Sequence, residues 1–213
     1  NKEHIVLAGG GPASVNAAQT LRQAGFRGSI RMISKESHVG YDRTALSKDF
    51  SGTGMEQGAR NAQFLEKYGI DVITGARTTQ LDKSNRIVRL DNGEELGYDK
   101  LLIATGGSPK MPHVEGSRLN GVLTLRNAND HGRIKEYLEK VKRVVVIGAS
   151  FIGMETASSI KTAYPDCEVI VLGKETLPFE KMFGEKVSTM LYNQHVEKGI
   201  TFKLDRKVER FSG

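Results

Sequence analysis

The chain has 213 residues, of which 38% are hydrophobic and 26% charged, and its formal net charge is +6. This is the composition of a globular protein long enough for two small domains. The basic residues are scattered along the chain and there is no tryptophan, which argues against a nucleic-acid-binding surface. We therefore expect no nucleic acid among the partners.

Cys167 is the only cysteine in the sequence. A disulfide framework, a Cys-rich metal site and a Cys-x-x-Cys redox pair all need more than one cysteine. No apolar run approaches the roughly 20 residues that cross a bilayer, and no signal peptide is recognisable. We expect no metal site and no membrane span. Because the chain opens on a core strand and stops in mid-fold, we also expect it to be part of a longer polypeptide.

The opening residues predict a phosphate-binding turn. An apolar strand over residues 5–8 leads into glycines and then into a helix that begins near Ala13. Gly9 permits the tight turn, and Gly11 lets a pyrophosphate approach the backbone at the positive end of the helix. Ser14 stands where this pattern usually has glycine or alanine, but it is small enough for close helix–strand packing. The competing interpretation is a glycine-rich turn that binds nothing.

The second predicted strand, residues 29–33, leads to a candidate ribose ligand. Glu36 follows this strand, and an acid at that place in a dinucleotide-binding fold accepts the ribose hydroxyls of the adenosine half. Its distance from Gly9 exceeds the usual spacing of about 20 residues. An exposed loop glutamate is therefore the alternative.

An antiparallel insertion interrupts the α/β alternation after the next helix and strand. Residues 86–90 and 94–96 flank an Asp-Asn-Gly turn and predict a β-hairpin. A buried strand that begins at Leu101 follows the hairpin. It ends in small residues that let the chain pass close to a ligand, namely Ala104, Thr105 and Gly106.

A second cycle of the same plan begins beyond a proline-containing linker at residues 109–116, and we place the domain boundary between residues 113 and 114. Strand, small-residue turn and helix recur over residues 143–157. Gly148 and Gly153 keep the pattern. Ser150 occupies its middle position, where its side chain either weakens dinucleotide binding or donates to a phosphate. The other predicted elements are helices over 128–141 and 187–198 and strands over 168–172 and 201–204.

Two phosphate-binding units in one chain predict an α/β protein with two Rossmann-like, three-layer domains, the first carrying an inserted antiparallel β-meander. Such a pair suits two dinucleotides held face to face. The natural assignment is FAD in the first domain, residues 1–113, and a nicotinamide dinucleotide in the second, residues 114–213, which is incomplete.

The sequence resembles the pyridine-nucleotide-dependent flavoprotein reductases, within them the ferredoxin-reductase and apoptosis-inducing-factor-like branch, and most of all its Rieske-associated mitochondrial members. Motifs in the family's order cover nearly the whole chain. They are residues 9–14, 41–48, 102–106, 124–126 and 146–155.

The resemblance implies that Arg43, Lys48 and Arg126 contact FAD and that the backbone of Thr78 lies near its adenine. By residue chemistry alone, the first two would be solvated cations of a surface loop. The resemblance also implies that Lys48 and Glu155 meet across the domain interface beside the flavin. There the glutamate would hold the ammonium, and the cation would stabilise negative charge on the reduced ring. Without the resemblance, Glu155 would be a first-turn helix acid favoured by the dipole.

In the second domain, Glu175 resembles the acid that receives the ribose of the nicotinamide nucleotide, and Lys181 a nearby cation. Lys174 leaves NADH against NADPH open, because a cation there could accept a 2′-phosphate. The expected catalytic residues are Lys48 and Glu155. The expected cofactor-binding residues are Gly9, Gly11, Pro12, Ala13, Ser14, Glu36, Arg43, Lys48, Thr78, Ala104, Thr105, Gly106, Arg126, Gly148, Ser150, Phe151, Ile152, Gly153, Glu175 and Lys181.

The implied function is that of an FAD-dependent NAD(P)H oxidoreductase, inactive as this fragment alone. Hydride passes from nicotinamide to flavin, and electrons go on to an iron–sulfur protein of ferredoxin or Rieske type, or to a quinone-like acceptor. The lack of a cysteine pair argues against a disulfide reductase. The alternative is a non-catalytic FAD-binding scaffold or redox sensor in a larger assembly. The expected compartment is the mitochondrion, with the cytoplasm as the alternative.

Overall fold

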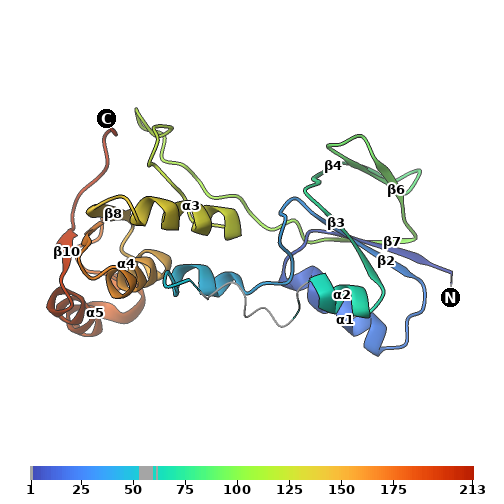
Figure 1. Ribbon diagram of the computed structural model, residues 1–213, viewed down its shortest axis with the longest axis horizontal. Helices are drawn as coiled ribbons and strands as arrows, with labels where there is room; N and C mark the ends of the chain where they lie inside the picture. Colours follow the sequence, from blue (N-terminus) through green and yellow to red (C-terminus); the bar gives the residue numbers. More distant parts are fainter. Residues whose placement is uncertain (1, 53–59, 61) are drawn as a thin grey trace. The chain divides into compact units, whose positions relative to one another are not determined.

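The computed structural model describes residues 2–52, 60 and 62–213. The chain divides into two compact units (Figure 1). The first unit is Asn1–Asp42 with Glu56–Ser108, and the second unit is Arg43–Met55 with Pro109–Gly213.

The first unit is built on a parallel sheet with the strand order β3-β2-β1-β7. Ile5, Val6 and Leu7 are all buried, so β1 shows no alternation between a polar and an apolar face. Such a continuous apolar run is typical of a parallel strand covered on both faces. The four strands are β1 (His4–Ala8), β2 (Ser29–Ser34), β3 (Ile70–Thr74) and β7 (Lys100–Ile103).

Helices cover one face of this sheet and a small antiparallel sheet covers the other (Figure 1). Val15 of α1 and Leu65 of α2 are buried in one cluster with the sheet. On the opposite face, Val6 and Ile33 are buried against Val88 of the antiparallel sheet. The first unit therefore has three layers. The covering elements are α1 (Pro12–Gln23), α2 (Ala62–Lys67), β4 (Thr78–Asp82), β5 (Ile87–Leu90) and β6 (Glu95–Gly97).

The antiparallel sheet contains the expected hairpin, since β5 and β6 pair on either side of the Asp-Asn-Gly turn. It also contains β4, which the sequence analysis did not predict. The reason lies in its residues, Thr-Thr-Gln-Leu-Asp, which are partly or fully exposed and lack alternation. A shift in register between Thr78 and Gln80 disturbs the pairing further.

The second unit has a three-stranded parallel sheet in the order β10-β9-β8. Val169 and Val171 of its central strand are fully buried in a cluster with α3 and α4. Val145 and Ile147 point to the other face and are each 49% exposed. The elements are α3 (Ala128–Leu138), β8 (Arg143–Ile147), α4 (Phe151–Ala163), β9 (Glu168–Leu172), α5 (Glu180–Glu197) and β10 (Ile200–Lys203).

Two elements of the second unit differ from expectation. The helix expected over 187–198 begins earlier, at Glu180, because a kink at Gly184 (φ 73°) joins two helical stretches. The polar segment around residues 43–48, for which no helix was expected, contains a short 3-10 helix, η1 (Arg43–Ser47). The α/β class, the parallel sheets and the inserted meander agree with the sequence analysis.

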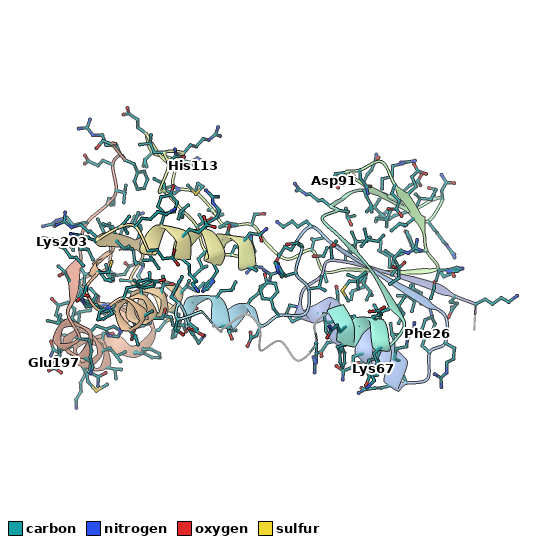
Figure 2. All side chains as sticks on the ribbon, in the orientation of Figure 1. Phe26, Lys67, Asp91, His113, Glu197 and Lys203 are labelled. Atoms are coloured by element: carbon teal, nitrogen blue, oxygen red, sulfur yellow. The ribbon has the colours of Figure 1, made fainter. Side chains whose placement is uncertain are left out.

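Arg22 near the end of α1 connects the segments that precede β2 and β3, and we expect its loss to destabilise the first unit. Its guanidinium donates to the carbonyls of Tyr68 (2.8 Å), Gly28 (2.8 Å) and Gly69 (2.7 Å). It also lies over the ring of Phe26, labelled in Figure 2, at 5.7 Å from the centroid. Arg22→Met should lower the free energy of unfolding by about 1–3 kcal/mol, because the partly buried bond to Gly28 and the exposed bonds to Tyr68 and Gly69 lose their charged donor.

Urea unfolding followed by circular dichroism measures this loss. Arg27→Met is the matched control, since it removes the same charge from an exposed side chain of the same unit. Equal unfolding midpoints for the two variants would contradict the prediction.

Cys167 lies in the core of the second unit at 4% exposure. Burial raises the pKa of its thiol, against the opposing effect of the Lys161 ammonium. Because the thiolate is the reactive form, we expect a disulfide reagent to react at least about tenfold more slowly with the folded protein than with the urea-unfolded protein at mildly alkaline pH. Equal rates would contradict this.

The raised pKa also sets a pH dependence of stability. The stabilising contribution of the neutral thiol is complete below the pKa of the unfolded chain and is lost as pH rises through the pKa of the folded state. The loss of stability at high pH should therefore be smaller in Cys167→Ala than in the wild type, as measured by thermal unfolding across alkaline pH.

Candidate functional site

The turn between β1 and α1 combines one glycine that is sterically required with one that faces open space. Gly9 has φ +128°, and a Cβ there would lie 2.1 Å from the carbonyl oxygen of Ala104. Gly11 caps α1 in an extended conformation, and a Cβ there would meet nothing within 4 Å. Within the described residues, no side chain caps α1. Its first N–H groups are therefore available to an anion.

The other expected FAD-binding residues of the first unit lie after its strands β2 and β7, at the start of α1 or at the start of β4. The N–H of Ala104 donates to Ala8 (2.8 Å), which brings residues 104–106 beside the turn. Glu36 comes two residues after β2, and the hydroxyl of Tyr41 donates to its carboxylate at 2.5 Å. Pro12 and Ala13 form the first turn of α1, and Thr78 begins β4.

Ser14 is the departure from the usual pattern, and the structure shows why serine fits. The side chain is completely buried on α1, where a larger residue would separate the helix from the sheet. Its Oγ has no hydrogen-bond partner among the described residues. An unpaired buried hydroxyl costs free energy. This one belongs to the first turn of α1, where N–H groups are available to an anion.

The turn between β8 and α4 has the same order of strand, turn and helix, but here one glycine, Gly148, combines a positive φ with open space at its Cβ position. Gly148 has φ +113°, its N–H donates to Leu172 (2.8 Å), and a Cβ there would meet nothing within 4 Å. At Gly153 a Cβ would lie 1.9 Å from the Gly148 carbonyl oxygen, so α4 crosses the turn closely. Ser150 is the N-cap residue, and its side chain makes no capping bond within the described part of the chain. Phe151 and Ile152 begin the helix and are 45% and 62% exposed.

Glu175 and Lys181 follow β9 in the second unit. A carboxylate oxygen of Glu175 would lie 2.8 Å from a Cβ placed on Gly173, so this side chain folds back toward the end of its strand. Lys181 is exposed in the first turn of α5.

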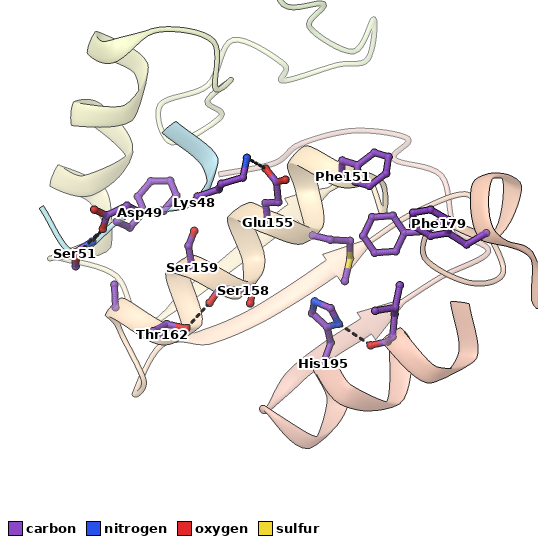
Figure 3. Close-up of a pocket in the computed structure, with 15 residues that line it drawn as sticks. Lys48, Asp49, Ser51, Phe151, Glu155, Ser158, Ser159, Thr162, Phe179 and His195 are labelled. Carbon is purple, nitrogen blue, oxygen red and sulfur yellow. Dashed lines mark hydrogen bonds and ion pairs between the residues drawn. The ribbon is translucent and has the colours of Figure 1, made fainter. Parts of the chain in front are cut away.

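The Lys48 ammonium and the Glu155 carboxylate form an ion pair, with Nζ 3.2 Å from Oε2 (Figure 3). Both residues belong to the second unit. The same Oε2 accepts from the hydroxyl of Ser47 at 2.5 Å, and Nζ also donates to the carbonyl of Thr44 at 3.1 Å. The Lys48 side chain is 52% exposed. The Glu155 carboxylate, which extends from α4, is thus bound by Ser47 of η1 and by Lys48, and the Lys48 ammonium remains accessible.

Arg43 and Arg126 also come together. Nη1 of Arg43 donates to the carbonyl of Arg126 at 3.0 Å. The Arg126 N–H donates to Asp130, which forms a capping box with Asn127 at the start of α3. The second unit therefore holds four of the expected residues in two contacts, Arg43 with Arg126 and Lys48 with Glu155.

Sequence reasoning missed Ser47 and His131. Ser47 is 5% exposed and binds the Glu155 carboxylate. Its position directly before Lys48 was the only available signal. His131 contacts the carbonyl of Asp49 across 82 residues of sequence, a relation that no local pattern reveals.

A pocket of about 610 Å³ lies beside the Lys48–Glu155 pair, entirely within the second unit (Figure 3). One side of α4 forms its floor, with the polar residues Glu155, Ser158 and Thr162. The aromatic rings of Phe151 and Phe179 line one end of the pocket, and their centroids lie 5.2 Å apart. His195 of α5 borders the pocket, and its Nδ1 is bonded to the carbonyl of Leu191.

Membrane-spanning helices and metal-binding clusters are both absent from the described residues. These residues contain no helix long and apolar enough to cross a membrane. They also contain no cluster of histidine, cysteine and acidic side chains able to hold a metal ion.

Known proteins share this arrangement over the whole chain. Human apoptosis-inducing factor 3 is 32% identical over 210 residues, which are 99% of this chain and 34% of that protein. The ferredoxin–NAD(+) reductase subunit of the benzene 1,2-dioxygenase system of Pseudomonas putida is 31% identical over 212 residues, 99% of this chain and 51% of that protein. The crystal structure of the ferredoxin reductase for the CYP199A2 system of Rhodopseudomonas palustris superposes with a TM-score of 0.90 at 28% identity and covers all of this chain and 52% of the other.

The chain thus spans about a third to a half of the length of these curated relatives. Residues 3–213 match the family model of the pyridine nucleotide-disulphide oxidoreductases. This chain belongs to the pyridine nucleotide-disulphide oxidoreductase family.

Proposed function

We propose that this chain is the nucleotide-binding part of an FAD-dependent NAD(P)H oxidoreductase that passes electrons to an iron–sulfur protein of the ferredoxin type. The observation that carries the proposal is the repeated strand–turn–helix unit. In each copy a glycine, Gly11 or Gly148, faces open space where a side chain would otherwise stand.

The residues present at both turns fit a dinucleotide. A pyrophosphate needs close approach to the backbone and free N–H groups at a helix start, and the space at Gly11 and Gly148 allows both. We assign FAD to the turn at residues 9–14 and the nicotinamide dinucleotide to the turn at residues 148–153. Glu36 and Glu175 are the proposed ribose ligands, and Lys181 is a proposed second contact to the nicotinamide nucleotide. FAD would supply the conversion of hydride transfer into single-electron transfer.

The residues of the chain itself would orient the cofactor and set the charge around it. The Lys48 ammonium offers a positive charge that favours electron-rich states nearby. Glu155 and Ser47 hold that charge in place, since one carboxylate oxygen contacts both the ammonium and the hydroxyl. Arg43 and Arg126 are proposed as further contacts to FAD.

Relatives support an iron–sulfur partner. Two of them are named a ferredoxin–NAD(+) and a rubredoxin–NAD(+) reductase of Pseudomonas putida, and a related solved structure is a covalent complex of putidaredoxin reductase with putidaredoxin. A Rieske-type or quinone-like acceptor and the mitochondrial compartment stay predictions of the sequence analysis.

Anaerobic addition of NADH to the full-length, FAD-loaded protein tests the proposal. We expect rapid bleaching of the visible flavin absorbance, and recovery of colour when an oxidised ferredoxin is added. NADPH in a parallel experiment gives the coenzyme preference. Bound FAD that NADH does not bleach would favour the non-catalytic scaffold, and failure to bind FAD would overturn both.

A further inference from the structure

His131 lies on the first turn of α3, and its side chain contacts two consecutive residues, Asp49 and Phe50, of the segment over residues 43–50. Its Nε2 is 2.7 Å from the carbonyl oxygen of Asp49. Its ring stacks on that of Phe50, with centroids 4.6 Å apart and an interplanar angle of 21°. Both rings are buried, His131 at 4% and Phe50 at 1% exposure. Because a carbonyl only accepts, Nε2 carries the proton and donates it.

Asp49 and Phe50, the two residues that His131 contacts, directly follow Lys48 in the sequence. At the other end of the same segment, Arg43 is bound to the carbonyl of Arg126, which precedes α3. In the middle, the hydroxyl of Ser159 on α4 donates to the carbonyl of Ser47 at 2.7 Å. The segment that carries Lys48 is therefore fixed at its start, its middle and its end, and His131 provides the last of these three contacts.

Lys48 needs such support because its own contacts are weak. A half-exposed ion pair on a flexible four-carbon stem contributes little by itself and loses side-chain entropy on ordering. The average place of the ammonium is therefore set by the backbone from which it extends. A displacement near 1 Å at a reacting centre can cost about a hundredfold in rate.

We propose that His131 is a positioning residue: by holding Asp49 and Phe50 it fixes the backbone of Lys48 and keeps the ammonium at Glu155. The catalytic consequence rests on the function proposed above. The anchoring itself does not, because its contacts lie within the second unit.

Two substitutions separate the hydrogen bond from the ring stack. His131→Phe keeps an aromatic ring on Phe50 but removes the donor to Asp49. His131→Gln removes the ring but places an amide N–H at a comparable reach. His195→Gln is the matched control, because that histidine borders the same pocket but its hydrogen bond and its ring contact are to α5 and β10, through the carbonyl of Leu191 and the ring of Phe202.

In the full-length, FAD-loaded protein, we expect His131→Phe to lower the rate constant of flavin reduction by NADH about tenfold, with FAD content unchanged. His131→Gln should recover most of that loss, and His195→Gln should match the wild type. Adding His131→Phe to Lys48→Met should cause no further loss, because His131 acts through Lys48. Additive losses in the double variant, or a wild-type rate in His131→Phe, would overturn the inference.

Amide hydrogen exchange supplies a readout that does not depend on activity. The N–H groups of Lys48 and Asp49 both donate to Ala45, so their exchange reports on this segment. We expect exchange over residues 48–51 to accelerate about tenfold in His131→Phe and not in His195→Gln. Unchanged exchange would refute the anchoring. If NADH fails to reduce the wild-type flavin while exchange still accelerates, the proposed function fails and the anchoring stands.

Discussion

Replacing Gly11 by valine is expected to weaken FAD binding at least about a hundredfold while the first unit stays folded. Gly11 has an extended backbone, φ −86° and ψ −177°, which valine adopts readily. A Cβ there meets no protein atom, so the new side chain would fill only the space that we assign to the pyrophosphate. FAD titration followed by fluorescence quenching measures the dissociation constant, and circular dichroism measures the fold.

Two further glycines of the first unit serve as comparisons. Gly97→Val should leave both FAD affinity and stability unchanged, because Gly97 ends β6 with nothing within 4 Å of its Cβ position. Gly9→Ala should destabilise the unit itself, since its Cβ would lie 2.1 Å from the Ala104 carbonyl oxygen at a positive φ. Undiminished FAD affinity in Gly11→Val would mean that the phosphate does not lie at this turn.

Replacing Lys48 by methionine should slow flavin reduction by NADH about a hundredfold in the full-length protein. Removing one preorganised charge at a site where negative charge develops typically costs that much. Methionine keeps much of the apolar stem, so the fold should be unaffected. The flavin reduction potential should also become more negative, because the reduced, electron-rich state loses a neighbouring cation.

Glu155→Gln should have a smaller effect, about tenfold, because the amide oxygen still accepts from Ser47 and Lys48 while the carboxylate charge is lost. Lys140→Met is the control, an exposed lysine in the same unit. Stopped-flow absorbance gives the rates and dye-coupled titration gives the potentials. If Lys48→Met and Lys140→Met reduce equally fast, Lys48 does not act on the flavin.

The sequence predicted those parts of the fold that depend on local pattern. The apolar run of β1, the glycines of its turn and the Asp-Asn-Gly hairpin all depend on neighbouring residues. The strand β4 was not predicted because its polar residues show no periodicity. The first part of α5 was not predicted because Gly184 interrupts the helical pattern. β4 forms through its pairing with β5, and α5 continues through Gly184, which adopts φ 73°.

The candidate site divides in the same way. Gly9 and Gly148 have positive φ values that favour glycine, and Gly11 follows in the same turn as Gly9, so motif spacing locates all three. The contact between Lys48 and Glu155 was inferred from family resemblance as one across the domain interface; it is present at 3.2 Å, with both residues in the second unit. The supports of Lys48 could not be inferred, because Ser47 and His131 act through partners 108 and 82 residues away.

The solitary, enclosed thiol of Cys167 makes this protein a convenient host for spectroscopic labels. A cysteine introduced on the surface would be far more reactive than the native one, so a spin label would attach at the chosen place without removing Cys167. Lys67→Cys in the first unit and Glu197→Cys in the second, both exposed and labelled in Figure 2, would form one such pair. Pulsed electron resonance between them could then follow the separation of the two units as each nucleotide is added.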